Sequence, residues 1–245
     1  MSQALRGRRA LITGSTVRTG LAIARAYEAA GAHVILHARQ DSEAARSAQA
    51  SIPDAELLFG DLTDPEACAQ LAADCAELGG IDALVNNVGV YAPTDLAETD
   101  AAHWRWTMAG NLDSSFTTTQ ALLPQLLASG RGRIIMLGFV GCDRLRATGQ
   151  ATAYQIAKTG VHLLARSYGL RFAHRGLTAN TISPGQLENS IDLTEAGPLP
   201  MGRPASAAEL AAAAVFMASD QASYINGANI DISGGWRPSR ERYED

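Results

Sequence analysis

The chain alternates short apolar runs with longer stretches in which apolar positions recur at helical spacing. The apolar runs are expected to be strands, and they fall at residues 8–13, 33–38, 56–59, 81–85, 132–137, 178–182 and 229–232. The helical patterns are expected at residues 21–30, 42–51, 63–78, 100–129, 154–174 and 207–219. Only short turns separate these elements, so strand and helix alternate throughout. This order predicts an α/β fold with a Rossmann-like, doubly wound parallel sheet and helices on both of its faces.

Boundary signals add detail at two places. Thr63 is expected to cap the helix over 63–78, with Pro65 early in its first turn. The segment from about residue 237 onward is mostly charged and polar, which is typical of a surface tail. No internal repeat or linker interrupts the alternation, so we expect a single domain over residues 1–245.

The composition agrees with a globular domain and excludes several classes of function. Hydrophobic residues make up 47% of the 245 residues and charged residues 18%, which suits a sizeable core. The formal net charge of −5 provides no basic field for nucleic acid, and no apolar run reaches the length of a membrane span. Cys68, Cys75 and Cys142 show no metal-ligand spacing, and the apolar run after the basic N-terminus is too short for a signal peptide. We therefore expect a cytoplasmic protein with reduced thiols, no metal, and no nucleic-acid or membrane partner.

One lysine stands out in an arginine-rich chain. Lys158 is the only lysine, and it lies four residues after Tyr154 in an expected helix. That spacing puts both side chains on one face, one turn apart. An ammonium beside a phenol favours the phenolate and lowers a reference pKa of about 10, which makes a tyrosine a usable proton donor near neutral pH. The alternative is an ordinary amphipathic helix that happens to contain both residues.

A glycine-containing turn joins the first expected strand to the first expected helix. It reads Thr-Gly-Ser-Thr-Val-Arg-Thr-Gly over residues 13–20. A turn of this kind exposes backbone N–H groups at the positive end of a helix, which suits a pyrophosphate. Its position at the first crossover of a doubly wound sheet favours a dinucleotide site over a plain turn.

The chain resembles the classical short-chain dehydrogenase/reductase family over nearly its full length, from Arg8 to Trp236. The matching motifs, in the family's order, are the Thr-Gly turn at 13–20, Asp61, Asn86-Asn87-Val88-Gly89, Asn111, Tyr154 with Lys158, Ser183-Pro184-Gly185 and residues 231–236. The resemblance implies a Rossmann-fold oxidoreductase with a nicotinamide cofactor.

The same resemblance implies roles for individual residues. The expected cofactor contacts are Gly14, Ser15, Thr16, Thr19 and Gly20 at the phosphates, Asp61 and Leu62 at the adenine, Asn87 and Gly89 on the adenosine side, and Pro184, Gly185 and Leu187 at the nicotinamide. Tyr154 is expected to donate a proton to a carbonyl oxygen as hydride arrives from nicotinamide. Lys158 would lower the tyrosine's pKa and bind the nicotinamide ribose, while Asn111 would hold a water in the proton relay. Asn111 is alternatively a simple polar residue in a helix.

Two arginines bear on the choice of cofactor. Arg18 stands where most of the family has glycine, and in having an arginine there the chain resembles the pteridine-reductase branch. Arg39 follows Ala38 at the end of the second expected strand. Enzymes that prefer NAD place an acid at the end of that strand, to bind the ribose 2′-hydroxyl. With no carboxylate there and two arginines able to pair with a 2′-phosphate, NADP(H) is favoured over NAD(H). A solvated surface arginine is the alternative for Arg39.

The serine that the family places at the end of the fifth strand is missing. Alignment from the strand puts that position on Phe139, alignment with a gap puts it on Gly138, and counting back from Tyr154 gives Gly141. Losing one donor to a developing oxyanion typically costs on the order of a hundred- to a thousandfold in rate. Phe139 is expected either to pack in the core or to stack on an aromatic substrate.

Other groups near the missing serine are candidates to replace it or to hold the substrate. The candidate donors are Thr148, Thr152, Cys142 and Gln150. Asp143 resembles the aspartate of pteridine reductases, but it lies about two positions out of register. Arg144 and Arg146 are surface residues or ligands for a carboxylate or phosphate. Only sixteen residues separate Gly185 from Gly202, which is short for a helical lid and indicates a more open pocket.

These features predict an NADP(H)-dependent oxidoreductase that transfers hydride between nicotinamide and a small-molecule carbonyl or alcohol. The resemblance also implies a homotetramer or dimer, formed through the helices around 100–129 and 154–174 and through the last strand. Two alternatives stay open. A pteridine-type C=N reductase is indicated by Arg18, and a cofactor-binding protein with weak or no catalysis is indicated by the missing serine.

Overall fold

The computed structural model describes residues 3–190 and 198–237, and its centre is a sheet of seven strands. The strands are β1 (Arg9–Ile12), β2 (His33–Ala38), β3 (Glu56–Phe59), β4 (Ala83–Asn86), β5 (Arg133–Leu137), β6 (Thr178–Pro184) and β7 (Asn229–Ile232). They are ordered β3-β2-β1-β4-β5-β6-β7, and every neighbouring pair is parallel. The predicted Rossmann-like, doubly wound sheet in a single α/β domain is confirmed.

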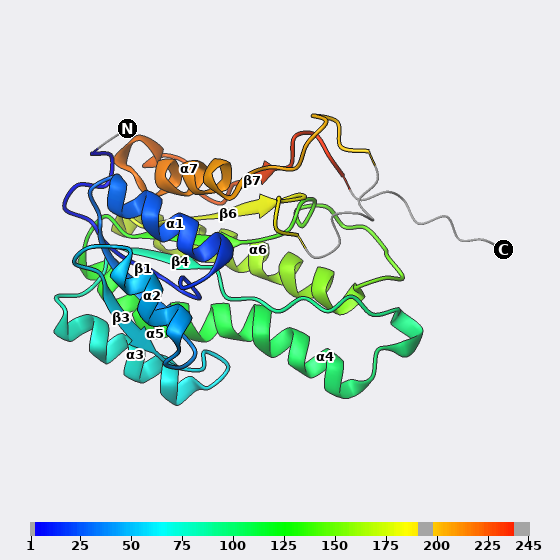
Figure 1. Ribbon diagram of the computed structural model, residues 1–245, viewed down its shortest axis with the longest axis horizontal. Coiled ribbons are helices and arrows are strands. Elements are labelled where there is room, and N and C mark those ends of the chain that lie inside the picture. The colour runs from blue at the N-terminus through cyan, green and yellow to red at the C-terminus, as the bar shows by residue number, and fades with distance from the viewer. Residues whose placement is uncertain (1–2, 191–197, 238–245) are drawn as a thin grey trace.

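Helices cover both faces of this sheet (Figure 1). The α-helices are α1 (Arg18–Ala29), α2 (Glu43–Ala50), α3 (Pro65–Glu77), α4 (Ala101–Met108), α5 (Ser114–Ala128), α6 (Thr152–Phe172) and α7 (Ala207–Ala218). The shorter turns are the 3-10 segments η1 (Leu96–Glu98), η3 (Ala173–Arg175) and η5 (Asp220–Ala222), and the π-helical turn η2 (Ala109–Asp113). On one face α1 packs against α7, and on the other α5 packs against α3 and α6.

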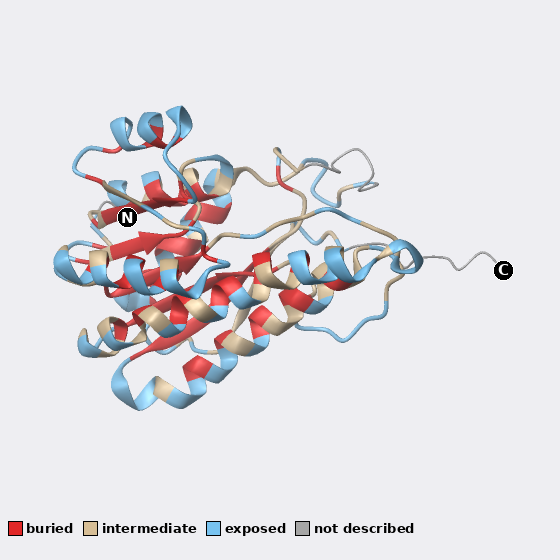
Figure 2. Cartoon of the chain, turned by 90° about the horizontal axis from the view of Figure 1, so that it is seen from below, coloured by how far each residue is buried: buried red, intermediate tan, exposed pale blue. Residues whose placement is uncertain are grey.

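The central strands are buried on both faces, as the burial colours in Figure 2 show. In β1, Ala10 and Ile12 belong to the apolar cluster beneath α1 and α7. Leu11, between them, belongs to the cluster beneath α3, α5 and α6. Strands enclosed on both sides have no polar face, which is why the sequence shows apolar runs where alternation would mark a half-exposed strand.

The start of α3 differs from the prediction. Thr63 was expected to cap this helix, but the N-cap is Asp64, whose side chain accepts a hydrogen bond from the Glu66 N–H at 2.9 Å. Thr63 instead donates through both its N–H and its hydroxyl to Asp61, at 3.0 and 2.7 Å. An aspartate one residue closer to Pro65 caps at least as well as a threonine, so it takes the position.

The expected helical region over 100–129 is present from Ala101 to Ala128, but it contains one irregular turn. The π-helical turn η2, at Ala109–Asp113, divides it into α4 and α5. A π-helical turn inserts an extra residue and rotates the side chains that follow. The other differences are shifts of two or three residues, since α1 begins at Arg18 and β4 at Ala83.

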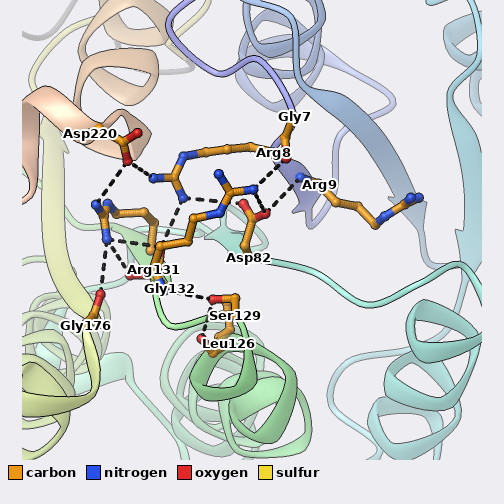
Figure 3. Close-up of polar contacts among 11 residues, drawn as sticks. Gly7, Arg8, Arg9, Asp82, Leu126, Ser129, Arg131, Gly132, Gly176 and Asp220 are labelled. Carbon is orange, nitrogen blue, oxygen red and sulfur yellow. Dashed lines mark hydrogen bonds and ion pairs between the residues drawn. The ribbon is translucent and has the colours of Figure 1, made fainter.

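A cluster of charged residues links the amino-terminal ends of the strands to the end of α7 (Figure 3). Arg8 and Arg131 bind the two carboxylate oxygens of Asp82, at 3.4 and 2.9 Å. Arg8 also pairs with Asp220 in η5, and Arg133 lies 3.7 Å from the same carboxylate. Since Arg8 and Arg133 are almost fully buried, their charges depend on these partners.

The carboxyl-terminal ends of the strands lie at the opposite edge, where ligands bind in sheets of this type. β1 and β4 are parallel neighbours in the sheet. From this pair, the later strands of the chain are added in opposite directions, β2 and β3 beyond β1 and β5 to β7 beyond β4. The crevice outside the carboxyl ends of strands at such a switch point is the usual ligand site. Within the described ranges, no helix is long and apolar enough to cross a membrane. Residues 191–197, which belong to the short stretch between Gly185 and Gly202, and the tail beyond residue 237 lie outside the described residues.

Candidate active site

The glycine turn after β1 is held closed by Asn87. Its side-chain amide donates to the carbonyl oxygens of Thr13 and Gly14, at 2.9 and 3.1 Å. Gly14 has a φ of +60°, and a Cβ on Gly20 would lie 2.2 Å from the Gly14 carbonyl oxygen. Both positions therefore require glycine. Asn87 was expected to contact the cofactor, and the structure uses its side-chain amide to shape the turn.

Ser15 joins the same turn to β2. Its N–H donates to the His37 carbonyl at 3.0 Å, and its hydroxyl accepts the His37 N–H at 2.9 Å. The Ser15 side chain is fully buried. Ser15 was expected to contact a phosphate; its hydroxyl is engaged with the strand, and Thr16 and Thr19 are the more accessible hydroxyls of the turn.

His37 is a structural part of this site that the sequence did not reveal. Its Nδ1 accepts a hydrogen bond from the Gly14 N–H at 3.1 Å, and its Nε2 lies 3.0 Å from the Gly60 carbonyl oxygen. A carbonyl can only accept, so His37 is the neutral tautomer with the proton on Nε2. Burial lowers the pKa of His37 to about 4. The only signal in the sequence was a histidine inside an apolar strand, which is also typical of an ordinary core position.

The buried neutral His37 makes the fold sensitive to acid. Its folded-state pKa lies below the ordinary value of about 6.5, so its contribution to stability is complete above pH 6.5 and is lost as pH falls towards 4. At 1.36 kcal/mol per pKa unit, the loss is about 3 kcal/mol. We expect His37→Gln, which keeps a donor and an acceptor but does not titrate, to lose less stability between pH 7.5 and 4.5 in urea unfolding. His174→Gln, at an exposed histidine, is the control, and equal pH dependence of His37→Gln and the native protein would contradict the assignment.

The amino-terminal end of α1 carries no side-chain cap. Val17 occupies the cap position without a side-chain hydrogen bond, and the first turn contains no acidic residue. The exposed Arg18 has a φ of +48°, the left-handed conformation that glycine adopts most readily. An arginine therefore occupies a glycine-type backbone position beside helix N–H groups that suit an anion.

The ends of β2 and β3 form the neighbouring part of the site. Ala38 is buried at the end of β2, and the exposed Arg39 follows it. Hydrogen bonds from Thr63 hold the pKa of the Asp61 carboxyl below its usual range, with a smaller contribution from the Arg39 charge. Leu62 is almost fully buried. The end of β2 thus presents a positive group with no carboxylate of its own.

Tyr154 and Lys158 lie one turn apart near the start of α6. The Lys158 ammonium is buried, donates to the Leu137 carbonyl oxygen at 2.9 Å, and lies 5.7 Å from the centre of the Tyr154 ring. Burial lowers the pKa of Lys158 to about 8. The predicted proximity of the two side chains is therefore present in the structure.

Asn111, in the π-helical turn η2, lies close to the Lys158 ammonium. Its amide nitrogen donates to the carbonyl oxygens of Val90 and Thr107, both at 2.9 Å. Its Oδ1 is buried and has no hydrogen-bond partner among the described residues. A Cβ on Gly89 would lie 2.8 Å from this oxygen and 3.1 Å from the Lys158 Nζ. Gly89 therefore leaves room around an unpaired acceptor and a buried ammonium.

The position of the missing serine is occupied by an aromatic ring. Gly138 has no room for a side chain, because a Cβ there would lie 2.6 Å from both the Ser183 Oγ and the Thr181 Cγ2. Phe139 follows, and its ring centre lies 6.0 Å from that of Tyr154 in an edge-to-face arrangement. Tyr91, which sequence reasoning missed, lies edge-to-face with Tyr154 at 4.9 Å. No regular pattern in the segment after Gly89 pointed to it.

The hydroxyl, amide and thiol groups proposed to replace the serine are engaged with other partners. The Thr148 hydroxyl donates to the Gln150 carbonyl at 2.9 Å, and the Thr152 hydroxyl donates to the Thr148 carbonyl at 2.8 Å. The Gln150 amide donates to Asp95 at 2.8 Å. Cys142 is buried, and its sulfur lies 3.2 Å from the Ser183 hydroxyl. The structure therefore does not bring these four groups together as an obvious substitute.

The remaining predicted residues flank this centre. Gly185 donates its N–H to the Ile232 carbonyl at 2.9 Å, and a Cβ there would lie 2.9 Å from Ser233. Pro184 is half-buried and Leu187 is buried. Asp143, Arg144 and Arg146 are exposed on the loop between β5 and α6.

Curated proteins of known activity align with almost the whole chain. A family model described as enoyl-(acyl carrier protein) reductase matches residues 19–237. The galactitol 2-dehydrogenase (L-tagatose-forming) of Cereibacter sphaeroides is 35% identical over 243 residues, covering 95% of this chain and 96% of that protein. The 3-oxoacyl-(acyl-carrier-protein) reductase FabG of Vibrio cholerae is 34% identical over 242 residues, covering 94% of this chain and 98% of that protein.

Solved structures agree with these relatives. A protein provisionally named an NAD(P)-dependent gluconate 5-dehydrogenase, from Beutenbergia cavernae and solved with NADP at low occupancy, is 32% identical, with a TM-score of 0.86 over 95% of this chain and 97% of that chain. The structure of gox2181 is 28% identical, with a TM-score of 0.88 over 95% of this chain and 97% of that chain. With the sheet order, the glycine turn and the placement of Tyr154 and Lys158, these matches lead to one conclusion: the chain belongs to the classical short-chain dehydrogenase/reductase family of NAD(P)-dependent oxidoreductases.

Proposed function

We propose that the protein is an NADP(H)-dependent oxidoreductase that interconverts a carbonyl compound and its alcohol. The observation that carries this proposal is the gathering of two groups about the buried Lys158 ammonium: the Tyr154 ring, whose centre lies 5.7 Å away, and the unpaired Asn111 Oδ1, which shares the space beside Gly89. A protein that only bound a cofactor would not need a tyrosine beside a buried cation. The direct test is oxidation of NADPH in the presence of a panel of carbonyl compounds.

Each of the three residues has a distinct task in this proposal. The Tyr154 hydroxyl donates a proton to the substrate carbonyl oxygen, acting as the general acid. The Lys158 ammonium stabilises the phenolate that this donation leaves. Asn111 Oδ1 accepts a hydrogen bond from a water that returns the proton. NADPH, when bound, supplies the hydride for the carbonyl carbon.

The residues present fit a phosphorylated dinucleotide. The uncapped end of α1 offers backbone N–H groups to the pyrophosphate, and the glycines at positions 14 and 20 keep side chains out of its way. Arg18 and Arg39, both exposed beside an end of β2 without a carboxylate, would bind the 2′-phosphate. The Beutenbergia cavernae relative solved with NADP supports the same choice.

We expect NADPH to bind more tightly than NADH, and this preference to depend on the two arginines. A charge-assisted hydrogen bond contributes about 1.5–3 kcal/mol, so Arg39→Ala should weaken NADPH binding by roughly ten- to a hundredfold and leave NADH binding unchanged. Arg18→Gly removes the second charge while restoring the residue that its backbone conformation favours. Fluorescence titration measures both affinities, with Arg175→Ala at a distant exposed arginine as the control. Equal affinities of the native protein for the two cofactors would contradict the assignment.

A second candidate function is a cofactor-binding protein with little or no turnover. It is favoured by one observation, the aromatic ring of Phe139 in the place of the serine. A pteridine-type reductase is supported only by Arg18 and is included in the substrate panel. Substitution of Tyr154 separates catalysis from binding, as discussed below.

We further propose that the protein is a homo-oligomer, a tetramer or a dimer. Ile156, Leu163 and Leu170 recur at seven-residue spacing on α6, with 45%, 61% and 87% of their surfaces exposed. Phe116 on α5 is 43% exposed. An apolar stripe of this kind on paired helices is typical of a subunit interface.

Sedimentation velocity is expected to show a species heavier than the single chain. Leu163→Glu should shift this species to a lower mass, because it places a charge in the apolar stripe. Glu28→Ala, on α1, is the control.

A further inference from the structure

The end of β5 provides no hydroxyl to the substrate. Gly138 cannot carry a side chain, because Ser183 and Thr181 already occupy that space. At the next position, Phe139 places a half-buried ring beside Tyr154. The candidate donors Thr148, Thr152 and Gln150 are hydrogen-bonded within the loop or to Asp95. The residues at the end of β5 and in the loop before α6 therefore do not replace the serine as a hydrogen-bond donor beside Tyr154.

A carbonyl that lacks the serine's hydrogen bond has a higher barrier to reduction unless the substrate itself lowers that barrier. Losing one oxyanion donor costs on the order of a hundred- to a thousandfold in rate. An electron-withdrawing group next to the reacting carbonyl offsets this cost, because it makes the carbon more electrophilic and spreads the developing negative charge. A second carbonyl on the adjacent carbon is such a group.

The surroundings of Tyr154 also indicate the shape of the substrate. Tyr91 and Phe139 both meet the Tyr154 ring edge-to-face, at 4.9 and 6.0 Å, and all three rings are half-buried. Such a set of rings offers flat, largely apolar walls beside Tyr154. Aromatic groups pack against walls of this kind in offset or edge-to-face arrangements, with a gain beyond simple burial.

We propose that the enzyme reduces aromatic vicinal dicarbonyl compounds, with Phe139 as the residue that determines this specificity. The inference rests on the proposed function, whose NADPH is the reductant. One carbonyl carbon gains the hydride as its C=O π bond breaks, and its oxygen gains the Tyr154 proton. NADPH becomes NADP⁺, the product is an α-hydroxy ketone, and a proton from solvent restores Tyr154.

Three probes test separately the preference for a second carbonyl and the preference for a flat aromatic ring. 1-Phenyl-1,2-propanedione is both flat and activated, 1-cyclohexyl-1,2-propanedione is activated but not flat, and acetophenone carries the ring without the second carbonyl. We expect the native enzyme to have a kcat/KM at least about tenfold higher for the phenyl diketone than for either of the others. Comparable kcat/KM values for the three probes would overturn the proposal.

Two substitutions at one position then test the residue. Phe139→Ser should raise kcat/KM for acetophenone by roughly ten- to a hundredfold, because it restores a donor, and should lower it for the phenyl diketone. Phe139→Leu keeps an apolar side chain without a ring, so it should reduce the preference for phenyl over cyclohexyl and bring no gain with acetophenone. An unchanged ratio of diketone to acetophenone in Phe139→Ser would contradict the role of Phe139.

A binding measurement and a wider panel complete the test. Calorimetry with the turnover-deficient Tyr154→Phe variant should show tighter binding of the phenyl than of the cyclohexyl diketone, and a loss of that difference when Phe139→Leu is added. If either Phe139 variant fails to fold, the native enzyme's ranking of the three probes still decides. If none of the probes is reduced but galactitol or another alcohol is oxidised, this inference fails and the proposed function stands. If no substrate reacts although NADPH binds, both fail.

Discussion

Tyr154→Phe is expected to lower kcat by at least about a thousandfold while NADPH affinity stays within about threefold. General acid catalysis typically contributes a factor of about 10² to 10⁴, and in the proposed mechanism the Tyr154 hydroxyl is the proton donor to the reacting oxygen. Phenylalanine keeps the ring that packs against Tyr91 and Phe139, so the shape of the site should be preserved.

The measurement pairs stopped-flow turnover with a fluorescence titration of NADPH. Tyr168→Phe is a matched control, because it makes the same change on the same helix at a buried hydroxyl without a hydrogen-bond partner in the described structure. It should leave kcat within about twofold. Undiminished turnover in Tyr154→Phe would remove the tyrosine from the mechanism. Loss of NADPH binding in Tyr154→Phe would show instead that Tyr154 mainly binds the cofactor.

Lys158→Met is expected to lower kcat by at least about a hundredfold without lowering the free energy of unfolding. The folded-state pKa of about 8 lies below the ordinary 10.5, so below pH 8 the buried ammonium destabilises the folded state. At 1.36 kcal/mol per pKa unit, this penalty is about 3 kcal/mol. Methionine fills a similar volume, but it leaves the Leu137 carbonyl unpaired at a cost of about 1–3 kcal/mol. The free energy of unfolding should therefore stay unchanged or rise by up to about 2 kcal/mol at pH 7.

The stability difference between Lys158→Met and the native protein is expected to depend on pH. As pH rises from 8 towards 10.5, folded Lys158 loses its proton before the unfolded chain does, so the penalty shrinks in the native protein and is absent from the variant. Urea unfolding at pH 7 and pH 10 should show the stability advantage of Lys158→Met narrowing with pH. Lys158→Arg is the companion variant, since it keeps the charge in a bulkier, planar group and should remain poorly active. A variant several kcal/mol less stable at pH 7 would show that Lys158 is mainly a structural residue.

The sequence predicted the fold and the centre of the site because both depend on local spacing. Buried parallel strands appear as apolar runs, and the spacing from Tyr154 to Lys158 matches one helical turn. The glycine turn was visible because the left-handed backbone at Gly14 and the close contact at Gly20 both favour glycine. These signals require only neighbours in the chain.

The features that the sequence did not show depend on contacts between distant segments. Helical periodicity could not locate the π-helical turn that aims Asn111, since the extra residue leaves the apolar pattern nearly unchanged. The role of His37 depends on Gly14 and Gly60, each more than twenty positions away. Tyr91 lies in an irregular segment, so no pattern predicts the direction of its side chain.

The presence of a single lysine, buried within α6, has a consequence for proteolysis. A protease that cuts only after lysine has one peptide bond available in the whole chain, and that bond lies between Lys158 and Thr159. Because Lys158 is only 4% exposed and the bond is enclosed in a helix, cleavage requires that this part of the structure open. The rate of that single cut, which yields two fragments, therefore reports how often the centre of the candidate active site unfolds.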